Sequence, residues 1–406
     1  MAVIRVVHLV GSPTSQAYFD LSALYAGDCL AALHQPDKYE FIIALVTPDG
    51  LWRFPASLDN AAVDAAQPMA MAEAITRLAR QKINMALPQM FCLAGMTHYR
   101  SILELLGIPY LGNRPFQMAL SADKAKAKAV VAAAGVRVPA GQLLHRGESQ
   151  GWGQHLSQSQ VPTLSLALPV VVKPNNSDNS DGVTLVRHAD DYPAALALAF
   201  TFSDAVLVET YVPLGREVRC AVVVQGGQLR CLPLEEYFVD SVIRPVRTRQ
   251  DKLKRDGDNQ LVLAAKQASQ AWMVDPLDPV VPAVWESARL CHAALGCEQY
   301  SLFDFRIDPD GVPWFLEAGL YCSFSPKSVI PTMMAAAGTP LGEFFDRAVS
   351  ELLAAFTAAP HAAAAVSLTP LLTAPITASL TASFATTLSP IAAPPLTQAT
   401  AAPDLI

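Results

Sequence analysis

Two carboxylates, Asp304 and Glu317, stand in apolar segments that a short turn connects. Asp304 lies in LFDFRID, Glu317 lies in PWFLEAG, and Asp310-Gly311 between them is a hairpin-turn signal. We expect the two carboxylates to face each other on one side of a sheet. Opposed carboxylates among apolar side chains repel each other unless a cation lies between them, and proteins hold nucleotide-bound Mg²⁺ with one or two carboxylates. The hairpin therefore predicts a magnesium site, and a solvated acidic hairpin is the alternative.

Basic residues near this hairpin fit phosphate chemistry. Arg306 follows Asp304 by two positions and hence shares its strand face, where it could hold a transferring phosphate or a substrate carboxylate. Lys173 ends the apolar run VVVKP, and the polar loop 175–182, which includes Ser180, can close over phosphate oxygens with its backbone N–H groups. A lysine at a strand end is common, so VVVKP alone is a weak signal.

Two further glutamates are candidates for nucleoside binding. Glu209 ends one expected strand and Glu217 begins the next. Their carboxylates could accept hydrogen bonds from an adenine amino group and from ribose hydroxyls. A surface charge is the alternative for each of them.

The elements around these residues predict an α/β protein of three domains, because apolar runs of strand length alternate with amphipathic helical stretches. Residues 1–113 are expected to form a Rossmann-like domain of strand–helix repeats, with ligand loops at the strand ends. Residues 114–208 and 209–355 are expected to form two further domains, the second with the metal hairpin. Residues 356–406 are rich in Ala, Thr, Ser and Pro and almost uncharged, which predicts a disordered tail.

Three local features refine this division. Ser121 is expected to cap a helix that stops at Gly135. Residues 145–168 are expected to be an exposed insertion. The segment 241–260 is polar and rich in Arg and Lys, which favours a mobile loop.

Composition limits the function classes. The 406 residues carry a formal net charge of −7 and are 52% hydrophobic, so no basic surface for nucleic acid is expected. No run of about 20 apolar residues and no signal peptide stands out, so the protein is expected to be cytoplasmic. The seven cysteines form no CxxC pair and are expected to be buried free thiols.

The order of these features along the chain resembles the ATP-grasp superfamily. The helix lysine Lys124 comes first, followed by the strand lysine with its polar loop, the two glutamates, the basic loop and the metal hairpin. The resemblance covers residues 1–350 and is greatest to the D-alanine–D-alanine ligase group. It implies that Lys124 and Lys173 contact ATP phosphates, that Glu209 binds adenine and that Glu217 binds ribose. It further implies that Lys252 lies on a loop that closes the site, that Asp304 and Glu317 bind Mg²⁺, and that Ser328 holds the carboxylate of the attacking amino acid.

The sequence departs from that group at several positions. The group's E-x-N metal motif is Glu317-Ala318-Gly319 here, which leaves open whether one or two Mg²⁺ ions bind. The arginine that usually stands two residues before the metal aspartate is Leu302, so Arg306 is expected to take its role. The first loop, GSPTSQAYF, lacks the glutamate that binds the amino group of the first D-alanine, and PQMFCLAGMTHYR (88–100) replaces another substrate loop.

These departures resemble the ligase-like enzymes of mycosporine-like amino acid biosynthesis. The shared runs include DLSALYAGDCLAA, YSLFDFRIDPDG and WFLEAGLYCSFSPKSVI. The resemblance implies that serine or threonine is joined to mycosporine-glycine through a phosphorylated intermediate, giving a shinorine-type product, and that the protein is a homodimer. A D-alanine–D-alanine ligase or other ATP-grasp peptide ligase is the alternative, and a non-catalytic nucleotide-binding protein is another.

Overall fold

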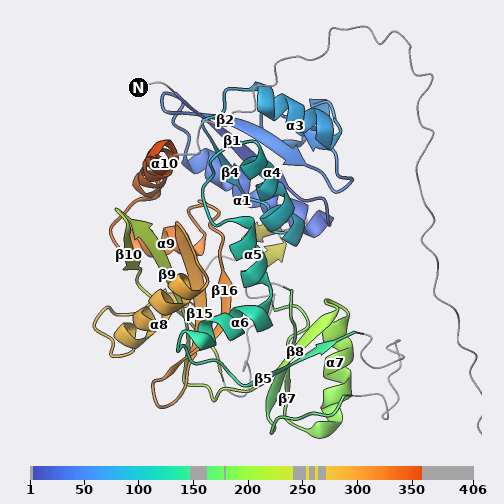
Figure 1. Ribbon diagram of the computed structural model, residues 1–406, viewed down its shortest axis with the longest axis vertical. Helices are drawn as coiled ribbons and strands as arrows, with labels where there is room; N and C mark the ends of the chain where they lie inside the picture. Colours follow the sequence, from blue (N-terminus) through green and yellow to red (C-terminus); the bar gives the residue numbers. More distant parts are fainter. Residues whose placement is uncertain are drawn as a thin grey trace, which may run out of the picture. The chain divides into compact units, whose positions relative to one another are not determined.

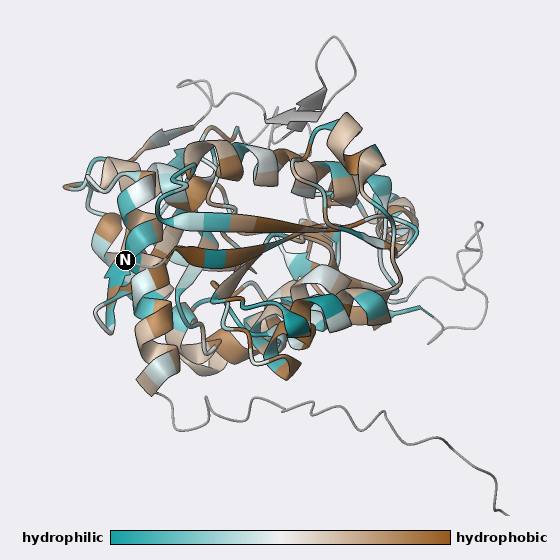
Figure 2. Ribbon diagram, turned by 90° about the horizontal axis from the view of Figure 1, so that it is seen from above, coloured by the Kyte–Doolittle hydropathy of each residue, from teal (hydrophilic) through white to brown (hydrophobic). Residues whose placement is uncertain are grey.

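The computed structural model describes residues 3–146, 162–177, 180–240, 253–255, 261–263 and 271–358. All of them belong to one compact unit that ends at Ala365. Among the described residues, three sheets of four to six strands organise this unit (Figure 1). Apolar residues concentrate on the strands in the middle of the molecule, whereas the surrounding helices carry mixed colours (Figure 2).

The first sheet has the strand order β3-β2-β1-β4. Strands β1 (Ile4–Gly11), β2 (Tyr39–Val46) and β4 (Met85–Pro88) are parallel, and the short β3 (Trp52–Arg53) pairs antiparallel with β2. The other elements of this region are helices: α1 (Gln16–Ala32), α2 (Asn60–Ala65), α3 (Met71–Arg80), the π-helix η1 (Gly95–Tyr99) and α4 (Arg100–Leu105). Parallel strands with helical crossovers are the strand–helix repeat predicted for this region.

Helices α5 (Pro115–Ala122) and α6 (Lys124–Ala133) follow the first sheet. The predicted N-cap, Ser121, is wrong, because that residue lies inside α5. Asp123 is the cap of α6, and its carboxylate accepts a hydrogen bond from the backbone N–H of Lys126. Asp is as good an N-cap as Ser, so the sequence alone did not choose between them. Gly135 has φ +89°, as expected for a residue just past a helix end.

The second sheet has the strand order β5-β8-β6-β7. Its strands are β5 (Gly141–His145), β6 (Val170–Pro174), β7 (Thr184–Val186) and β8 (Ala205–Thr210). The short η3 (Ala189–Asp191) and helix α7 (Tyr192–Phe200) follow β7, and α7 packs its apolar side on the sheet, with Leu196, Val172 and Val208 in one core. Figure 1 shows α7 alongside these strands.

The third sheet has the strand order β14-β11-β9-β15-β16, and β10 pairs with β9. Its strands are β9 (Arg216–Gln225), β10 (Gln228–Cys231), β11 (Glu235–Tyr237), β14 (Ala271–Met273), β15 (Tyr300–Ile307) and β16 (Pro313–Gly319). Two shorter strands, β12 (Leu253–Arg255) and β13 (Leu261–Leu263), form a separate pair. Gly226 and Gly227 both have positive φ, which fits a tight turn between β9 and β10.

One face of the third sheet is apolar and lies under helices. Phe303, Phe305 and Phe315 share a core with residues of α6 and of α8 (Val281–Ala294). Because side chains alternate along a strand, the residues between these phenylalanines point to the opposite face. That opposite face carries the polar residues of the candidate site.

The core packing bears on the three expected domains. Helix α6, expected to belong to residues 114–208, packs with the third sheet, and β8 runs through the expected boundary at 208/209. Helices α9 (Val329–Ala336) and α10 (Leu341–Ala358) close the described chain, so a helix continues past the expected end of the third domain at 355. The division into domains stays a prediction.

Several other expectations concern the chain as a whole. All seven cysteines are free, six of them are buried and Cys297 is partly buried, which confirms the thiol prediction. Within the described ranges, no helix has the length and apolarity needed to cross a membrane. Most of the expected insertion 145–168, almost all of the basic loop 241–260, and the tail lie outside the described residues.

Candidate active site

A row of four charged residues crosses the polar face of the third sheet. Glu235 on β11 pairs with Arg219 on β9, Arg219 pairs with Asp304 on β15, and Asp304 pairs with Glu317 on β16. Directly paired residues on neighbouring strands project from the same face. The hairpin therefore places Asp304 opposite Glu317, as the sequence predicted.

Each of the two predicted metal carboxylates has a basic neighbour. The Nε atom of Arg219 lies 2.7 Å from Oδ1 of Asp304, and the Nζ atom of Lys124 lies 3.8 Å from Oε2 of Glu317. Arg219 also stacks over the ring of Tyr237, with its guanidinium carbon 5.0 Å from the ring centroid. Sequence reasoning missed Arg219, and the signal available was its place in the charged run REVR.

A second row lies beside the first on the same face. Tyr237 pairs with Glu217, and Glu217 pairs with Arg306. Nη2 of Arg306 lies 2.8 Å from Oε2 of Glu217, and Nη1 donates a hydrogen bond to the carbonyl of Val212. Arg306 shares the face of Asp304 as predicted, and it forms an ion pair with Glu217, the residue predicted to bind ribose.

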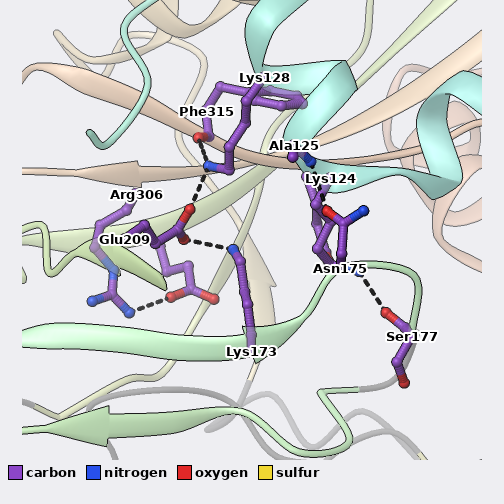
Figure 3. Close-up of polar contacts among 11 residues, drawn as sticks. Lys124, Ala125, Lys128, Lys173, Asn175, Ser177, Glu209, Arg306 and Phe315 are labelled. Carbon is purple, nitrogen blue, oxygen red and sulfur yellow. Dashed lines mark hydrogen bonds and ion pairs between the residues drawn. The ribbon is translucent and has the colours of Figure 1, made fainter. Parts of the chain in front are cut away.

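Two lysines hold Glu209 from opposite sides (Figure 3). Nζ of Lys173 lies 2.5 Å from Oε1 of Glu209, and Nζ of Lys128 lies 3.2 Å from Oε2 and donates to the carbonyl of Phe315. Burial raises the pKa of Glu209, but the two lysine charges outweigh it and hold the pKa below its ordinary value. Burial lowers the pKa of Lys128 to about 8, against the opposing charge of Glu209.

Lys128 was not among the predicted site residues. It lies one helical turn after Lys124 on α6, so both side chains leave the same side of that helix. The spacing in ADKAKAK was the signal that could have identified it. Lys124 itself donates to the carbonyl of Ser177, which ties α6 to the polar loop after β6.

A cavity lies between the second and third sheets, with an empty volume of about 780 Å³ that includes its open mouth. Such a volume falls within the range of small-molecule sites. Eight of the predicted site residues line it: Lys124, Lys173, Ser180, Glu209, Glu217, Asp304, Arg306 and Glu317. The structure thus brings together residues from α6, β6, β8, β9, β15 and β16.

A second cavity of about 840 Å³ shares Lys124 and Glu317 with the first. Its other walls come from the first loop and the start of α1, the segment after β4 with η1, helix α5, the loop after β6, and the end of β16 with the segment that follows it. They are Thr14, Tyr18, Phe91, Cys92, Leu93, Met96, Ser121, Ala122, Asn176, Ala318, Leu320 and Tyr321. Of the described residues that line it, Glu317 is the one carboxylate. The wall is mostly aromatic and apolar.

The two remaining predicted residues are Ser328 and Lys252. Ser328 is the residue before α9, and its hydroxyl donates to the carbonyl of Ser325, 2.8 Å away. Ser328 is not among the lining of either cavity. Lys252 lies outside the described residues.

The residues present fit a magnesium ion that is shared with a nucleotide. The described residues contain no group of three or more Asp, Glu, His or Cys side chains that could enclose a metal. Asp304 and Glu317 would supply two oxygen ligands, and phosphate and water oxygens would complete the octahedral shell that Mg²⁺ requires. Lys124 and Lys173, which line the same cavity, fit the phosphates themselves.

Comparison with known proteins agrees with this geometry. The family described as "D-ala D-ala ligase C-terminus" matches residues 130–350. A D-alanine–D-alanine ligase of Citrifermentans bemidjiense is 30% identical over 251 residues, which are 61% of this chain and 72% of that protein. Among solved structures, the VanG D-Ala:D-Ser ligase of Enterococcus faecalis has a TM-score of 0.69 and 21% identity, covering 86% of this chain and 100% of its own. The D-alanine–D-alanine ligase of Bacillus anthracis in complex with ATP has a TM-score of 0.62 and 20% identity, covering 87% and 98%.

The three sheets and the cavity between the second and third define the ATP-grasp fold. The chain belongs to the D-alanine–D-alanine ligase family. It is accordingly an ATP-dependent, ADP-forming carbon–nitrogen ligase that uses ATP and Mg²⁺.

The two departures from the family's metal motif occupy one place in the structure. Leu302 and Gly319 are directly paired across β15 and β16, next to the pair Asp304 and Glu317. Leu302 is buried in an apolar core with Tyr300 and Phe324. Arg306, expected to replace the arginine missing at 302, forms an ion pair with Glu217, and Arg219 forms an ion pair with Asp304.

Proposed function

We propose that this ligase joins the amino group of an amino acid to an acceptor whose oxygen has been phosphorylated by ATP. The observation that carries the proposal is the meeting of the two cavities at Lys124 and Glu317. A nucleotide in the first cavity would present its terminal phosphate to an acceptor in the second. The placement of the two cavities supports direct phosphoryl transfer between them.

The proposed roles of the residues follow from their positions. Lys124 and Lys173 bind phosphate oxygens, and Asp304 and Glu317 bind Mg²⁺. Glu217, held by Arg306, binds the ribose, and Glu209 lies at the adenine end, where Lys128 and Lys173 fix its carboxylate. Ser180, with φ +62°, lines the cavity in the polar loop and contributes to phosphate binding. Lys252 as a residue of a closing loop and Ser328 as a carboxylate anchor remain proposals from the resemblance.

The reaction balances in two steps. The acceptor oxygen attacks the terminal phosphorus of ATP, the bridging P–O bond breaks and ADP leaves. The amine nitrogen then attacks the activated carbon, the new C–N bond forms, and inorganic phosphate leaves with the acceptor oxygen while the amine loses a proton. Lys124 and the metal carboxylates neutralise and position the phosphoryl group, which is the main work such a transfer asks of the protein.

For the acceptor, the relatives favour D-alanine, because they are named D-alanine–D-alanine ligases. A D-alanine–D-alanine ligase or other ATP-grasp peptide ligase is therefore better supported by the comparisons than the mycosporine reading. Dipeptide formation is accordingly the leading proposal for the substrates.

One observation favours mycosporine-glycine as a second candidate acceptor. The second cavity is walled by Tyr18, Phe91 and Tyr321, and Glu317 is the one carboxylate among its described lining residues. A cavity of this kind suits a ring acceptor better than a free ammonium group, which needs a carboxylate partner. Serine or threonine would then be the amine, and the product would be a shinorine-type imine. Homodimer formation and a cytoplasmic location remain predictions.

The test is phosphate release from the full chain with ATP and Mg²⁺, measured with D-alanine alone and with mycosporine-glycine plus serine or threonine. Release with D-alanine, with the dipeptide seen by mass spectrometry, supports the leading proposal. Release only with mycosporine-glycine and an amino acid supports the second. If neither D-alanine nor mycosporine-glycine with an amino acid stimulates phosphate release, both substrate proposals are contradicted.

A further inference from the structure

The charges around the two metal carboxylates are already balanced by the protein. Asp304 has the guanidinium of Arg219 at 2.7 Å, and Glu317 has the ammonium of Lys124 at 3.8 Å. A pair of carboxylates attracts divalent ions most strongly when nothing else neutralises it. Here each carboxylate brings one negative charge and each basic neighbour brings one positive charge, so these four charges cancel. Glu235, on the other side of Arg219, adds one negative charge one strand further from Asp304.

Arg219 is held firmly at this place. It stands directly between Glu235 and Asp304 in the sheet, and only 13% of its side chain is exposed. The ring of Tyr237 covers its guanidinium. Such a side chain loses little further freedom when a ligand binds, so its charge is a permanent part of the site.

The site also has few ligands to offer. Gly319, two residues after Glu317 on the same strand face, has no side chain, and its cross-strand partner is the apolar Leu302. The described residues contain no cluster of three metal-binding side chains. Two carboxylates, each with a basic side chain beside it, suit one Mg²⁺ ion that receives most of its ligands from the nucleotide to which it is bound.

We propose that Arg219 is a positioning residue that neutralises and orients Asp304, and that with Lys124 it restricts the site to a single Mg²⁺ ion that arrives bound to ATP. Without nucleotide, the two basic neighbours repel a free divalent ion. With nucleotide, the phosphates supply the negative charge and the oxygens that the site lacks. The proposal rests on the ATP-dependent ligase class alone and not on the identity of the acceptor.

The test counts bound Mn²⁺, a spin-active substitute for Mg²⁺, by electron paramagnetic resonance on the full chain. We expect no saturable Mn²⁺ binding to the protein alone, and one Mn²⁺ for each bound molecule of a non-hydrolysable ATP analogue. Two Mn²⁺ ions for each bound analogue would overturn the proposal, and so would saturable Mn²⁺ binding by the wild-type protein alone.

Substitution of Arg219 tests whether its positive charge weakens Mn²⁺ binding. Arg219→Gln removes the positive charge, so the variant is expected to gain saturable Mn²⁺ binding without nucleotide, which the wild type lacks. Arg219→Lys keeps the charge and is expected to behave as the wild type does. A residue of purely structural importance would give no such gain on substitution, so the absence of saturable Mn²⁺ binding in Arg219→Gln without nucleotide would contradict the proposal.

The matched control is Arg216→Gln on the same strand. Arg216 pairs with Glu236 and Asp278, away from the metal carboxylates, and its loss is expected to leave Mn²⁺ binding unchanged. If no acceptor supports phosphate release, the proposed substrates are wrong, but the expected numbers of bound Mn²⁺ ions do not change. The two proposals therefore fail separately.

Discussion

Lys128 and Glu209 form a buried ion pair, with 3.2 Å between Nζ and Oε2 and with both side chains less than 7% exposed. Lys128 belongs to α6, which packs on the third sheet, whereas Glu209 belongs to β8 of the second sheet. The pair therefore joins the two sheets that enclose the cavity with the metal carboxylates. Removal of one partner of a buried pair leaves a charge without compensation, which is far more costly than the pair is stabilising.

We expect Lys128→Met to lower the free energy of unfolding by roughly 3 kcal/mol, because Glu209 would keep only Lys173 as a partner. Denaturant unfolding measures this change. The control is Lys126→Met, two positions earlier on the same helix, where the side chain is 72% exposed and no measurable change is expected. Equal effects of the two substitutions would mean that the buried pair does not hold the halves together.

We expect Asp304→Asn and Glu317→Gln each to lower turnover at least roughly a hundredfold, because each removes a charged ligand of the nucleotide-bound metal. The measurement is ATP-dependent phosphate release at saturating acceptor. Thermal unfolding is expected to stay near that of the wild type, since both substitutions keep the side-chain volume. Turnover close to wild type in either variant would remove that residue from the metal site.

Gly319→Asn tests why the site takes one ion. An added Cβ at Gly319 meets no atom within 4 Å, so the substitution is expected to fold normally. Its amide oxygen would supply a ligand beside Glu317, and we expect a second, weaker Mn²⁺ in the presence of the ATP analogue. Gly319→Ala provides the matched control, because it adds the Cβ without the oxygen. If the count stays at one in Gly319→Asn, a missing ligand at position 319 is not what excludes a second ion.

His8 should make stability depend on pH. Burial lowers its pKa to about 4, with a smaller opposing effect of the Gln89 side chain. Between pH 6.5 and 4 the unfolded chain takes up a proton that the folded chain does not, so the contribution of His8 is lost as pH falls through this window. At pH 5 the loss is about 2 kcal/mol relative to neutral pH.

Unfolding free energies at pH 7.5 and pH 5 check this expectation. The difference between the two pH values is expected to shrink in His8→Leu, whose core position accepts an apolar side chain. In His98→Leu, at an exposed position, the difference should stay as in the wild type. An undiminished pH dependence in His8→Leu would assign the acid sensitivity to other groups.

The metal hairpin could be predicted from sequence because it is local. Asp304, the turn and Glu317 lie within one short segment, which predicts the hairpin. A register shift between Asp304 and Phe305, which alternation alone does not predict, places Glu317 opposite Asp304. The alternation of strands and helices likewise predicted the parallel first sheet. Local spacing was enough for these features.

The contacts that depend on long-range register could not be predicted in the same way. The pairing of Arg219 with Asp304 requires β9 to lie beside β15 in one particular alignment, and a shift by one residue would turn Arg219 to the apolar face. Sequence reasoning considered only Arg306, the nearest basic residue along the chain, and did not identify Arg219. The wrong helix cap at Ser121 has a different cause, because Asp123 offered an equally good helix cap two residues later.

The central claim, that the chain is an ATP-dependent carbon–nitrogen ligase with a phosphorylated acceptor, is tested most directly with an acceptor labelled with ¹⁸O at the reacting oxygen. The account predicts that one ¹⁸O atom appears in the inorganic phosphate for each C–N bond formed, in step with one ADP. Release of unlabelled phosphate, or of ADP without product, would instead show that water attacks ATP, and it would contradict the account.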